Sequence, residues 1–194
     1  LAQHGLHVPR GTMALDRVTA ANQALEVGFP VALKVLGLAH KTGFNGLALD
    51  LNSNDEIKAA LLQLAPGRVL VEHMVTGAVA ELLVGITRDP AHGFVLTLAA
   101  GGTMTELRED SACLLVPAAR GHITAALNSL KMAPLLYGYR GKPCVKFDAI
   151  LDAIDAVQSY VFANKDSVEE VEINPLICTA QTAVAVDALI RKTQ

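Results

Sequence analysis

Two apolar runs of strand length near the C-terminal end of the chain are interrupted by three polar residues. The first run, VEINPLIC, carries Glu172 and Asn174, and the second, AVAVDALI, carries Asp187; the turn-like sequence TAQT separates the two runs. Charged side chains are rarely buried unless they are paired or bound to a metal. Residues two apart in a strand point to the same face, so Glu172 and Asn174 share one. If TAQT closes a hairpin, Asp187 lies across from them.

This polar face has two interpretations. Two carboxylates and an amide oxygen on one face suit a hard cation such as Mg2+. A polar sheet face turned toward solvent explains the same pattern. The segment alone does not decide between a metal site and a solvated surface.

The length and composition limit the other possibilities. A chain of 194 residues suits one large domain or two small lobes, and the sequence PGRVL near residues 66–70 is the expected boundary, with lobes at about 1–69 and 70–194. Hydrophobic residues make up 52% of the chain, but Gly, Pro, Thr or charged residues cut every long apolar reach, so we expect no membrane span and no secretory leader. The net charge of −3 gives no basic footprint for nucleic acid.

The cysteines and histidines point to no metal cluster of their own. Cys113, Cys144 and Cys178 are widely spaced and form no CxxC motif, which is typical of the reduced thiols of a cytoplasmic protein. The six histidines form no HxxxH or HExxH arrangement that would indicate zinc. Because the chain begins at Leu1 inside a helix-like pattern, we expect it to be a piece of a longer polypeptide, with some catalytic groups outside it.

Helical and strand patterns alternate along the chain. A short helix ends at Gly5, a longer one ends at Gly28, and a third begins at Ser53 with Glu56 three residues later, which is a capping-box pattern. VALKVL and LALDLN are expected strands, and DPAHG is a turn between the strands AELLVGITRDP and GFVLTLAAGG. Two further helices, RGHITAALNSLKMA and FDAILDAIDAVQSYVFAN, complete an α+β pattern.

A lysine and a glycine loop form the first candidate site. Lys34 stands in an apolar strand, where an unpaired ammonium costs several kcal/mol, so it either meets an anion such as phosphate or reaches water from an edge strand. The loop HKTGFNG follows, and its Gly43 and Gly46 let the backbone N–H groups approach an anion, although an ordinary hairpin loop has the same composition. His40 stands alone among polar neighbours, as surface histidines do.

Acidic residues and a glycine pair form the second candidate site. Glu72 and Glu81 lie near the ends of apolar strands, where a carboxylate can accept a ribose hydroxyl or simply face solvent. Gly101 and Gly102 follow a strand and precede Glu106, which suits the surroundings of a phosphate or metal, or a tight turn with a solvated acid.

The order of these elements resembles the ATP-grasp domain of the NDP-forming acyl-CoA synthetases. That family includes ADP-forming acetyl-CoA synthetase and is related to the succinyl-CoA synthetase β subunit. The resemblance runs through GLHVPRG, GFPVALKV, LLYGYRGKP, EINPLI and AVDALI, and so covers essentially the whole chain. It implies an α+β ATP-grasp fold of two lobes, with the nucleotide bound in the cleft between them.

The resemblance also implies a role for each candidate residue. The expected nucleotide ligands are Lys34, Lys41 and Gly46 for the phosphates, Glu72, His73 and Met74 as the hinge that reads adenine through its backbone, and Glu81 for the ribose. The expected Mg2+ ligands are Asn174 and Asp187, with Glu172 close by or ligating. His40 would carry a phosphoryl group, and Gly101, Gly102 and Glu106 would surround the phosphates.

The implied reaction is acid + CoA + ATP giving acyl-CoA + ADP + phosphate through phosphohistidine. CoA and the small-molecule acid would be bound mainly by CoA-binding and CoA-ligase domains outside this chain, in an oligomer when full-length. Family members usually read HKTDVGGV at the glycine loop, so Gly43 and Asn45 depart from the pattern, and Leu114 stands where an arginine is expected. The alternative is therefore a synthetase-like binding or regulatory module without turnover, as in certain protein acetyltransferases. The sequence does not name the acyl acid.

Overall fold

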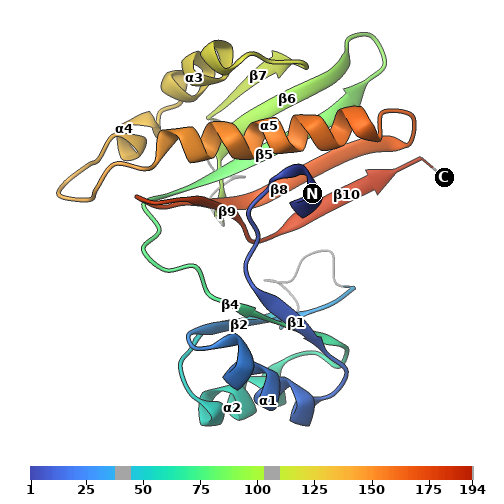
Figure 1. Ribbon diagram of the computed structural model, residues 1–194, viewed down its shortest axis with the longest axis vertical. Coiled ribbons are helices and arrows are strands. Elements are labelled where there is room, and N and C mark those ends of the chain that lie inside the picture. Colours follow the sequence, from blue (N-terminus) through green and yellow to red (C-terminus); the bar gives the residue numbers. More distant parts are fainter. Residues whose placement is uncertain (38–44, 103–109, 194) are drawn as a thin grey trace. The chain divides into compact units, whose positions relative to one another are not determined.

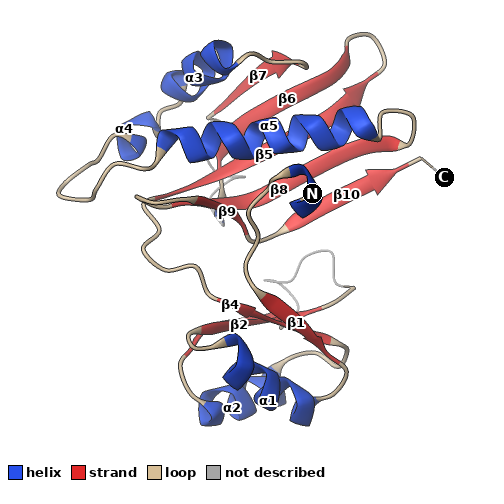
Figure 2. Ribbon diagram, in the orientation of Figure 1, coloured by secondary structure: helices blue, strands red, loops and turns tan. Residues whose placement is uncertain are grey.

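The structure is a computed structural model that describes residues 1–37, 45–102 and 110–193. The chain divides into two compact units (Figures 1 and 2). The first unit contains residues 1–8 and 75–194, and the second contains residues 9–74. Each unit is an antiparallel sheet with helices on one face.

The second unit is a four-stranded sheet in the order β1-β4-β2-β3 with two helices against it. Its elements are β1 (Gly11–Ala14), α1 (Arg17–Val27), β2 (Val31–Val35), β3 (Leu47–Leu51), α2 (Asn54–Gln63) and β4 (Val69–His73). Alternate residues of β2, such as Val31, Leu33 and Val35, pack with both helices in one core. The residues between them, Ala32 and Lys34, therefore lie on the sheet face that the helices leave uncovered.

Local sequence signals set the ends of both helices in this unit. The Asp16 carboxylate accepts a hydrogen bond from Thr19 N at 2.7 Å, which caps α1. At α2 the Ser53 hydroxyl accepts from Glu56 N at 3.3 Å, while the Glu56 carboxylate accepts from Asn52 N at 2.8 Å. The predicted capping pattern at Ser53 is therefore confirmed, with Asn52 in place of Ser53 as the returning donor.

The first unit is a larger antiparallel sheet in the order β10-β8-β5-β6-β7, with β9 paired to β8. Its elements are η1 (Ala2–His4), β5 (Ala80–Asp89), β6 (Gly93–Ala100), β7 (Ser111–Leu115), α3 (Arg120–Ser129), α4 (Ala133–Leu136), α5 (Phe147–Ala163), β8 (Val168–Cys178), β9 (Ala183–Ala185) and β10 (Ala188–Lys192). Helix α5 runs across one face of this sheet (Figure 1), and the apolar residues of α3, α5 and the strands form one core.

A bulge in β8 shifts the alternation of its side chains. Leu82 of β5 pairs with Leu176, but Val84 pairs with Ile173, so β8 has one residue more than β5 over this stretch. Ile173 and Leu176 both point into the core, with 0% and 1% exposure. The two residues between them, Asn174 and Pro175, are half-buried and belong to the face away from the helices.

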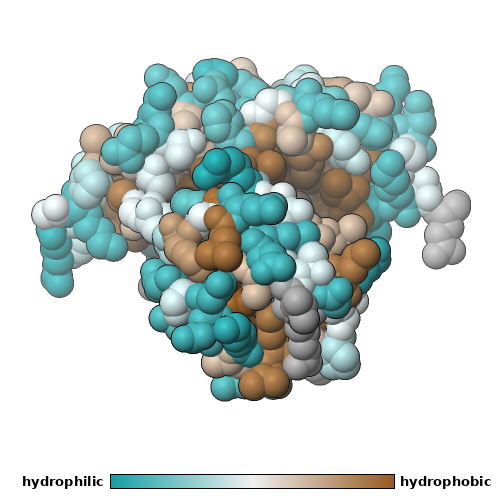
Figure 3. Space-filling model, turned by 60° about the horizontal axis from the view of Figure 1, so that its bottom comes forward, coloured by the Kyte–Doolittle hydropathy of each residue, from teal (hydrophilic) through white to brown (hydrophobic). Residues whose placement is uncertain are grey.

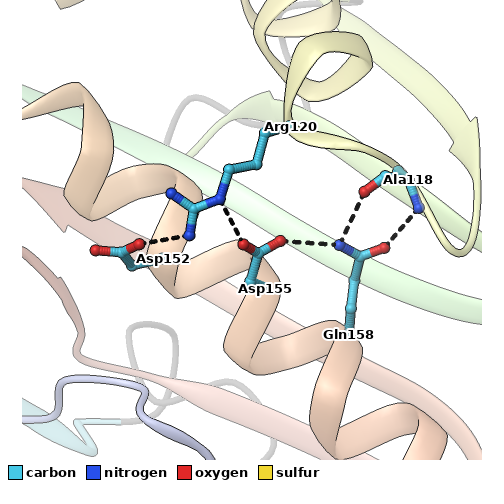
Figure 4. A network of polar contacts seen from close by, with 5 residues as sticks. All are labelled: Ala118, Arg120, Asp152, Asp155 and Gln158. Carbon is cyan, nitrogen blue, oxygen red and sulfur yellow. Dashed lines mark hydrogen bonds and ion pairs between the residues drawn. The ribbon is translucent and has the colours of Figure 1, made fainter.

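A polar network joins α3 to α5 in the first unit (Figure 4). The buried Gln158 side chain accepts a hydrogen bond from Ala118 N at 2.7 Å and donates one to Ala118 O at 3.2 Å. Arg120 forms ion pairs with Asp152 at 2.6 Å and Asp155 at 2.8 Å. The network fixes the segment that enters α3 against the middle of α5.

The unit boundary differs from the expected position near residues 66–70. The second unit extends to Met74 because β4 pairs with β1 on one side and with β2 on the other. The N-terminal residues join the first unit, since Leu6 is buried in its core and His7 O accepts from Ala185 N at 2.9 Å. In the described part of the chain, no helix is long and apolar enough to cross a membrane.

Candidate functional site

The second unit holds Lys34 in a buried ion pair. The Lys34 Nζ lies 2.5 Å from Glu72 Oε2, and the two side chains are 9% and 14% exposed. The pair forms because Ala32 is directly opposite Glu72, which makes Lys34 and Glu72 diagonal neighbours on one sheet face. The expectation that Lys34 meets an anion is met by a carboxylate of the chain itself. The structure thus gives the Glu72 side chain a position that sequence reasoning did not foresee.

Gly11 makes room for the Glu72 side chain. Gly11 lies opposite Glu72 in the β1–β4 pairing. A Cβ atom at position 11 would lie 2.7 Å from Glu72 Cγ and 2.9 Å from Val71 O, closer than van der Waals contact allows. Glycine at this position therefore lets Glu72 turn toward Lys34.

The predicted adenine hinge already uses two of its backbone donors. His73 N donates to Arg10 O and Met74 N donates to Pro30 O, both at 2.8 Å. In this conformation the two N–H groups extend the pairing of β4 with the segments that lead into β1 and β2. The hinge assignment for residues 72–74 remains a prediction, and its carbonyl oxygens are the groups to consider for the exocyclic amine of adenine.

The first unit brings five of the predicted site residues together. Asn174 Oδ1 accepts a hydrogen bond from Gly102 N at 3.0 Å, and Asn174 N donates to Asp187 O at 3.2 Å. The Glu81 carboxylate lies against Gly102, where a Cβ atom would collide with its Oε2. Gly101 N donates to Glu81 O at 2.8 Å, which ties the glycine pair to β5.

The predicted hairpin at the C-terminal end is confirmed. Cys178 pairs with Ala183 across the TAQT turn, and the chain then continues into β10, whose Ala188 pairs with Ile173. This pairing places Asp187 beside Asn174, as the sequence predicts. Glu172 is half-buried on the same face of β8 as Asn174, two residues before it. We call Glu172, Asn174 and Asp187 the polar platform.

The donor atoms of the polar platform suit Mg2+. Within residues 1–37, 45–102 and 110–193, no three His, Cys, Asp or Glu side chains gather closely enough to hold a metal ion by themselves. Mg2+ in nucleotide sites is held by one or two protein ligands and completes its octahedron with phosphate oxygens and water. The Asn174 amide oxygen has two lone pairs, so it can accept from Gly102 N and still ligate a cation. The platform therefore fits a Mg–nucleotide complex better than a bare metal site.

The buried Cys178 thiol lies close enough to Glu81 for the carboxylate to affect its pKa. Burial, and secondarily the charge of Glu81, raise the pKa of Cys178 to about 12. Cys178 is fully buried, whereas Cys113 and Cys144 are exposed. The Cys178 thiol is therefore a neutral packing group behind the platform.

Part of the predicted phosphate loop lies outside the described residues. His40, Lys41 and Glu106 belong to the segments 38–44 and 103–109. The described end of the loop is anchored, since Gly46 O accepts from Val35 N at 2.8 Å and Asn45 O accepts from Ala65 N at 2.9 Å. Asn45 adopts the left-handed conformation, with φ of 50°, that asparagine tolerates better than most residues.

Comparison with known proteins connects this geometry to a family. A family model of ATP-grasp domains matches residues 1–191. The chain is 27% identical to the beta subunit of ADP-forming acetate–CoA ligase II of Pyrococcus furiosus, over 98% of this chain and 86% of that subunit. It is 29% identical to a trans-feruloyl-CoA synthase from an unidentified prokaryote, over 96% of this chain but only 28% of that protein.

Solved structures agree with the sequence comparison. Acetyl-coenzyme A synthetase 1 of Ca. Korarchaeum cryptofilum, in complex with coenzyme A and Ca-AMPCP, superposes with a TM-score of 0.89 at 26% identity, covering 99% of this chain and 89% of that one. The same enzyme with coenzyme A and Mg-AMPPCP gives a TM-score of 0.81 at 26% identity, with 99% and 88% covered. The two antiparallel sheets, the paired polar residues and these matches lead to one conclusion: the chain belongs to the ATP-grasp domain family.

Proposed function

We propose that this chain is the nucleotide-binding, phosphoryl-transferring part of an ADP-forming acyl-CoA synthetase. The observation that carries the proposal is the joining of Asn174, Asp187 and Gly102 at one place on the uncovered face of the first unit's sheet. Related proteins named as ADP-forming acetate–CoA ligases support the reaction class. The net reaction is acid + CoA + ATP giving acyl-CoA + ADP + phosphate.

Each unit holds residues that suit the phosphates of a nucleotide. Lys34 offers a fixed ammonium, which Glu72 holds in place, to neutralise phosphate charge. Asn174 and Asp187, with Glu172 nearby, would hold Mg2+, which offsets negative charge on the transferring group. Glu81, whose carboxylate lies beside Gly102, would accept the ribose hydroxyls.

Other parts of the reaction are assigned to residues and domains by resemblance. His40 would relay the phosphoryl group between the nucleotide and a histidine of the CoA-ligase part, with Lys41, Gly46 and Glu106 around the phosphates. Neutral imidazole is a competent nucleophile near neutral pH. CoA and the acid would bind to CoA-binding and CoA-ligase domains in the same or a partner chain.

The departures at Leu114 and Asn45 do not by themselves favour a module without turnover, and Gly43 lies outside the described residues. Leu114 packs on the core of the first unit and pairs with the fully buried Leu96, so a cation there would not face the polar platform. Asn45 keeps a backbone conformation that a glycine would adopt, and it is held by Ala65. The enzyme reading is therefore the one we propose.

The Mg2+ dependence of nucleotide binding tests the proposal. In the natural full-length protein, Asp187→Ala should abolish the gain in ATP affinity that Mg2+ gives, measured by isothermal titration with and without the metal. Asp166→Ala is the matched control, because Asp166 is an exposed acid in the turn before β8. If Asp187→Ala responds to Mg2+ as strongly as Asp166→Ala, the carboxylate is only a solvated group between β9 and β10 and the platform is not a metal site.

A further inference from the structure

The loop between α4 and α5, residues 137–146, projects from the first unit and contains none of the residues that we assign to the nucleotide site. It extends from the first unit (Figure 1), and its side chains form a hydrophilic protrusion at the far left of the space-filling view (Figure 3). Residues 137–144 are all exposed, and two of them are aromatic: Tyr137 is 56% and Tyr139 is 45% exposed. Large exposed aromatic side chains gathered in one loop are typical of binding surfaces.

Both ends of the α4–α5 loop are fixed to the body of the unit. The Tyr137 hydroxyl donates to Asn128 Oδ1 at 2.5 Å, and the Tyr137 ring stacks on Phe147 with centroids 5.9 Å apart. At the other end, Val145 N donates to Leu136 O and Lys146 N donates to Thr179 O, both at 3.0 Å. The loop is therefore held in position before any partner arrives, which lowers the entropic cost of binding.

The tip of the loop presents cations beside an aromatic ring. Arg140 has a left-handed backbone with φ of 51°, and Lys142 N donates to Tyr139 O at 3.1 Å to close a tight turn. The Arg140 guanidinium lies 5.2 Å from the centre of the Tyr139 ring. Tyrosine and arginine together are the residue types that most often dominate the energy of protein interfaces.

The loop carries three cationic residues and no acidic residue. Residues 111–147 contain no Asp or Glu, although the whole chain has a net charge of −3. Arg120 in this stretch is paired with two acids of α5. Arg140, Lys142 and Lys146 make no ion pair with any of the described residues. The loop thus offers positive charge that no acid in the described part of the chain neutralises.

We propose that the α4–α5 loop is the docking site for an acidic surface of the CoA-ligase part. This inference rests on the proposed function, which requires such a part. The shape favours a protein over a small anion, because small molecules bind in concave sites whereas this loop protrudes. An acidic protein surface complements Arg140, Lys142 and Lys146, and apolar contact with Tyr137 and Tyr139 would supply the desolvated centre of the interface.

A crosslinking experiment on the natural full-length protein, together with its CoA-ligase part, tests the contact directly. A carbodiimide joins lysine amines to carboxylates without a spacer. Mass spectrometry should find Lys142 or Lys146 joined to Asp or Glu residues of the CoA-ligase part. Crosslinks that join these lysines only to residues of this domain, or to a second copy of it, would overturn the proposal.

Charge reversal tests the consequence for the reaction. Arg140→Glu/Lys142→Glu should lower acyl-CoA synthesis about tenfold or more at physiological salt, because like charges at an interface slow association and weaken the complex. Lys58→Glu/Lys165→Glu is the matched control, with the same charge change at exposed lysines elsewhere. Binding of Mg·ATP should be unchanged in both double variants.

Measuring both nucleotide binding and turnover distinguishes failure of the proposed function from failure of the docking site. Failure of the parent protein to bind Mg·ATP would refute the proposed function, whereas normal nucleotide binding with unaltered turnover in the Arg140/Lys142 variant would refute only the docking site. A rise in the KM for CoA alone, with no crosslink from Lys142 or Lys146 of the parent protein to the CoA-ligase part, would also overturn docking, since the loop would then bind the phosphates of CoA.

Discussion

Gln158 offers the clearest test of what holds the first unit together. Its amide oxygen accepts from Ala118 N at 2.7 Å, and its amide nitrogen donates to Ala118 O at 3.2 Å and to Asp155 at 3.3 Å. Gln158 is 6% exposed and Ala118 is 8% exposed, so water does not readily replace the side chain (Figure 4). Gln158→Leu keeps most of the volume but leaves both backbone groups of Ala118 without their partner.

The stability lost in Gln158→Leu follows from the unpaired backbone N–H and C=O groups of Ala118. A buried backbone donor or acceptor without a partner costs about 1–3 kcal/mol, so two cost about 2–6 kcal/mol. The added apolar surface of leucine returns about 1–2 kcal/mol. We expect a net loss of about 3 kcal/mol in the free energy of opening the α3–α5 contact. The neighbouring Arg120→Ala should cost much less, because its ion pairs with Asp152 and Asp155 are exposed and water screens them.

Amide hydrogen exchange measures this local opening without assuming that the whole protein unfolds in one step. Peptides covering residues 111–130 should exchange about a hundredfold faster in Gln158→Leu, since 1.36 kcal/mol corresponds to a factor of ten. Arg120→Ala serves as the comparison within the same network. Unchanged exchange in Gln158→Leu, or a larger effect in Arg120→Ala, would refute the reasoning that buried neutral hydrogen bonds outweigh exposed ion pairs here.

Two further predictions concern the two units separately. Gly11→Ala should displace the Glu72 side chain and so release Lys34, which should weaken ATP binding about tenfold in titration calorimetry. An affinity equal to that of the parent would show that the ion pair does not position the lysine. Iodoacetamide near pH 8 should label Cys113 and Cys144 but not Cys178, whose pKa of about 12 keeps the thiol neutral. Because this pKa is raised above the ordinary value of 9.0, the stability that depends on the neutral Cys178 is present below pH 9 and is lost as the pH rises toward 12, which alkaline unfolding can check.

Features that depend on neighbouring residues in the chain, such as helix starts, could be predicted from the sequence. Features that depend on pairing between distant strands could not. The capping residues Asp16 and Ser53 act within one helical turn, so the starts of α1 and α2 can be read from short stretches. Strand β7 was not expected, because it is short and its alternate residues are exposed, so no strong apolar run marks it. The two apolar runs on either side of the turn-like sequence TAQT predicted that Asp187 lies beside Asn174.

The Lys34–Glu72 ion pair could not be predicted from the sequence. The two residues are far apart in the chain and come together only through the register of β2 against β4. Gly11 gave no signal for the same reason, since its need for a small side chain arises from β1 lying opposite Glu72. A diagonal contact between two strands, such as that of Lys34 with Glu72, cannot be inferred before the order and register of the strands are known.

The bulge in β8 has a consequence for insertions and deletions. Ile173 and Leu176 are three residues apart, a spacing that would put them on opposite faces of a regular strand. The extra residue of the bulge keeps both in the core, while Asn174 stays on the opposite face. Losing one residue between Ile173 and Leu176 would leave these two residues two apart, so that regular alternation would bury both, but it would remove the bulge that sets the position of Asn174. The fold of the EINPL segment should therefore tolerate changes of side chain better than changes of length, whereas the exposed α4–α5 loop can gain or lose residues without moving a strand.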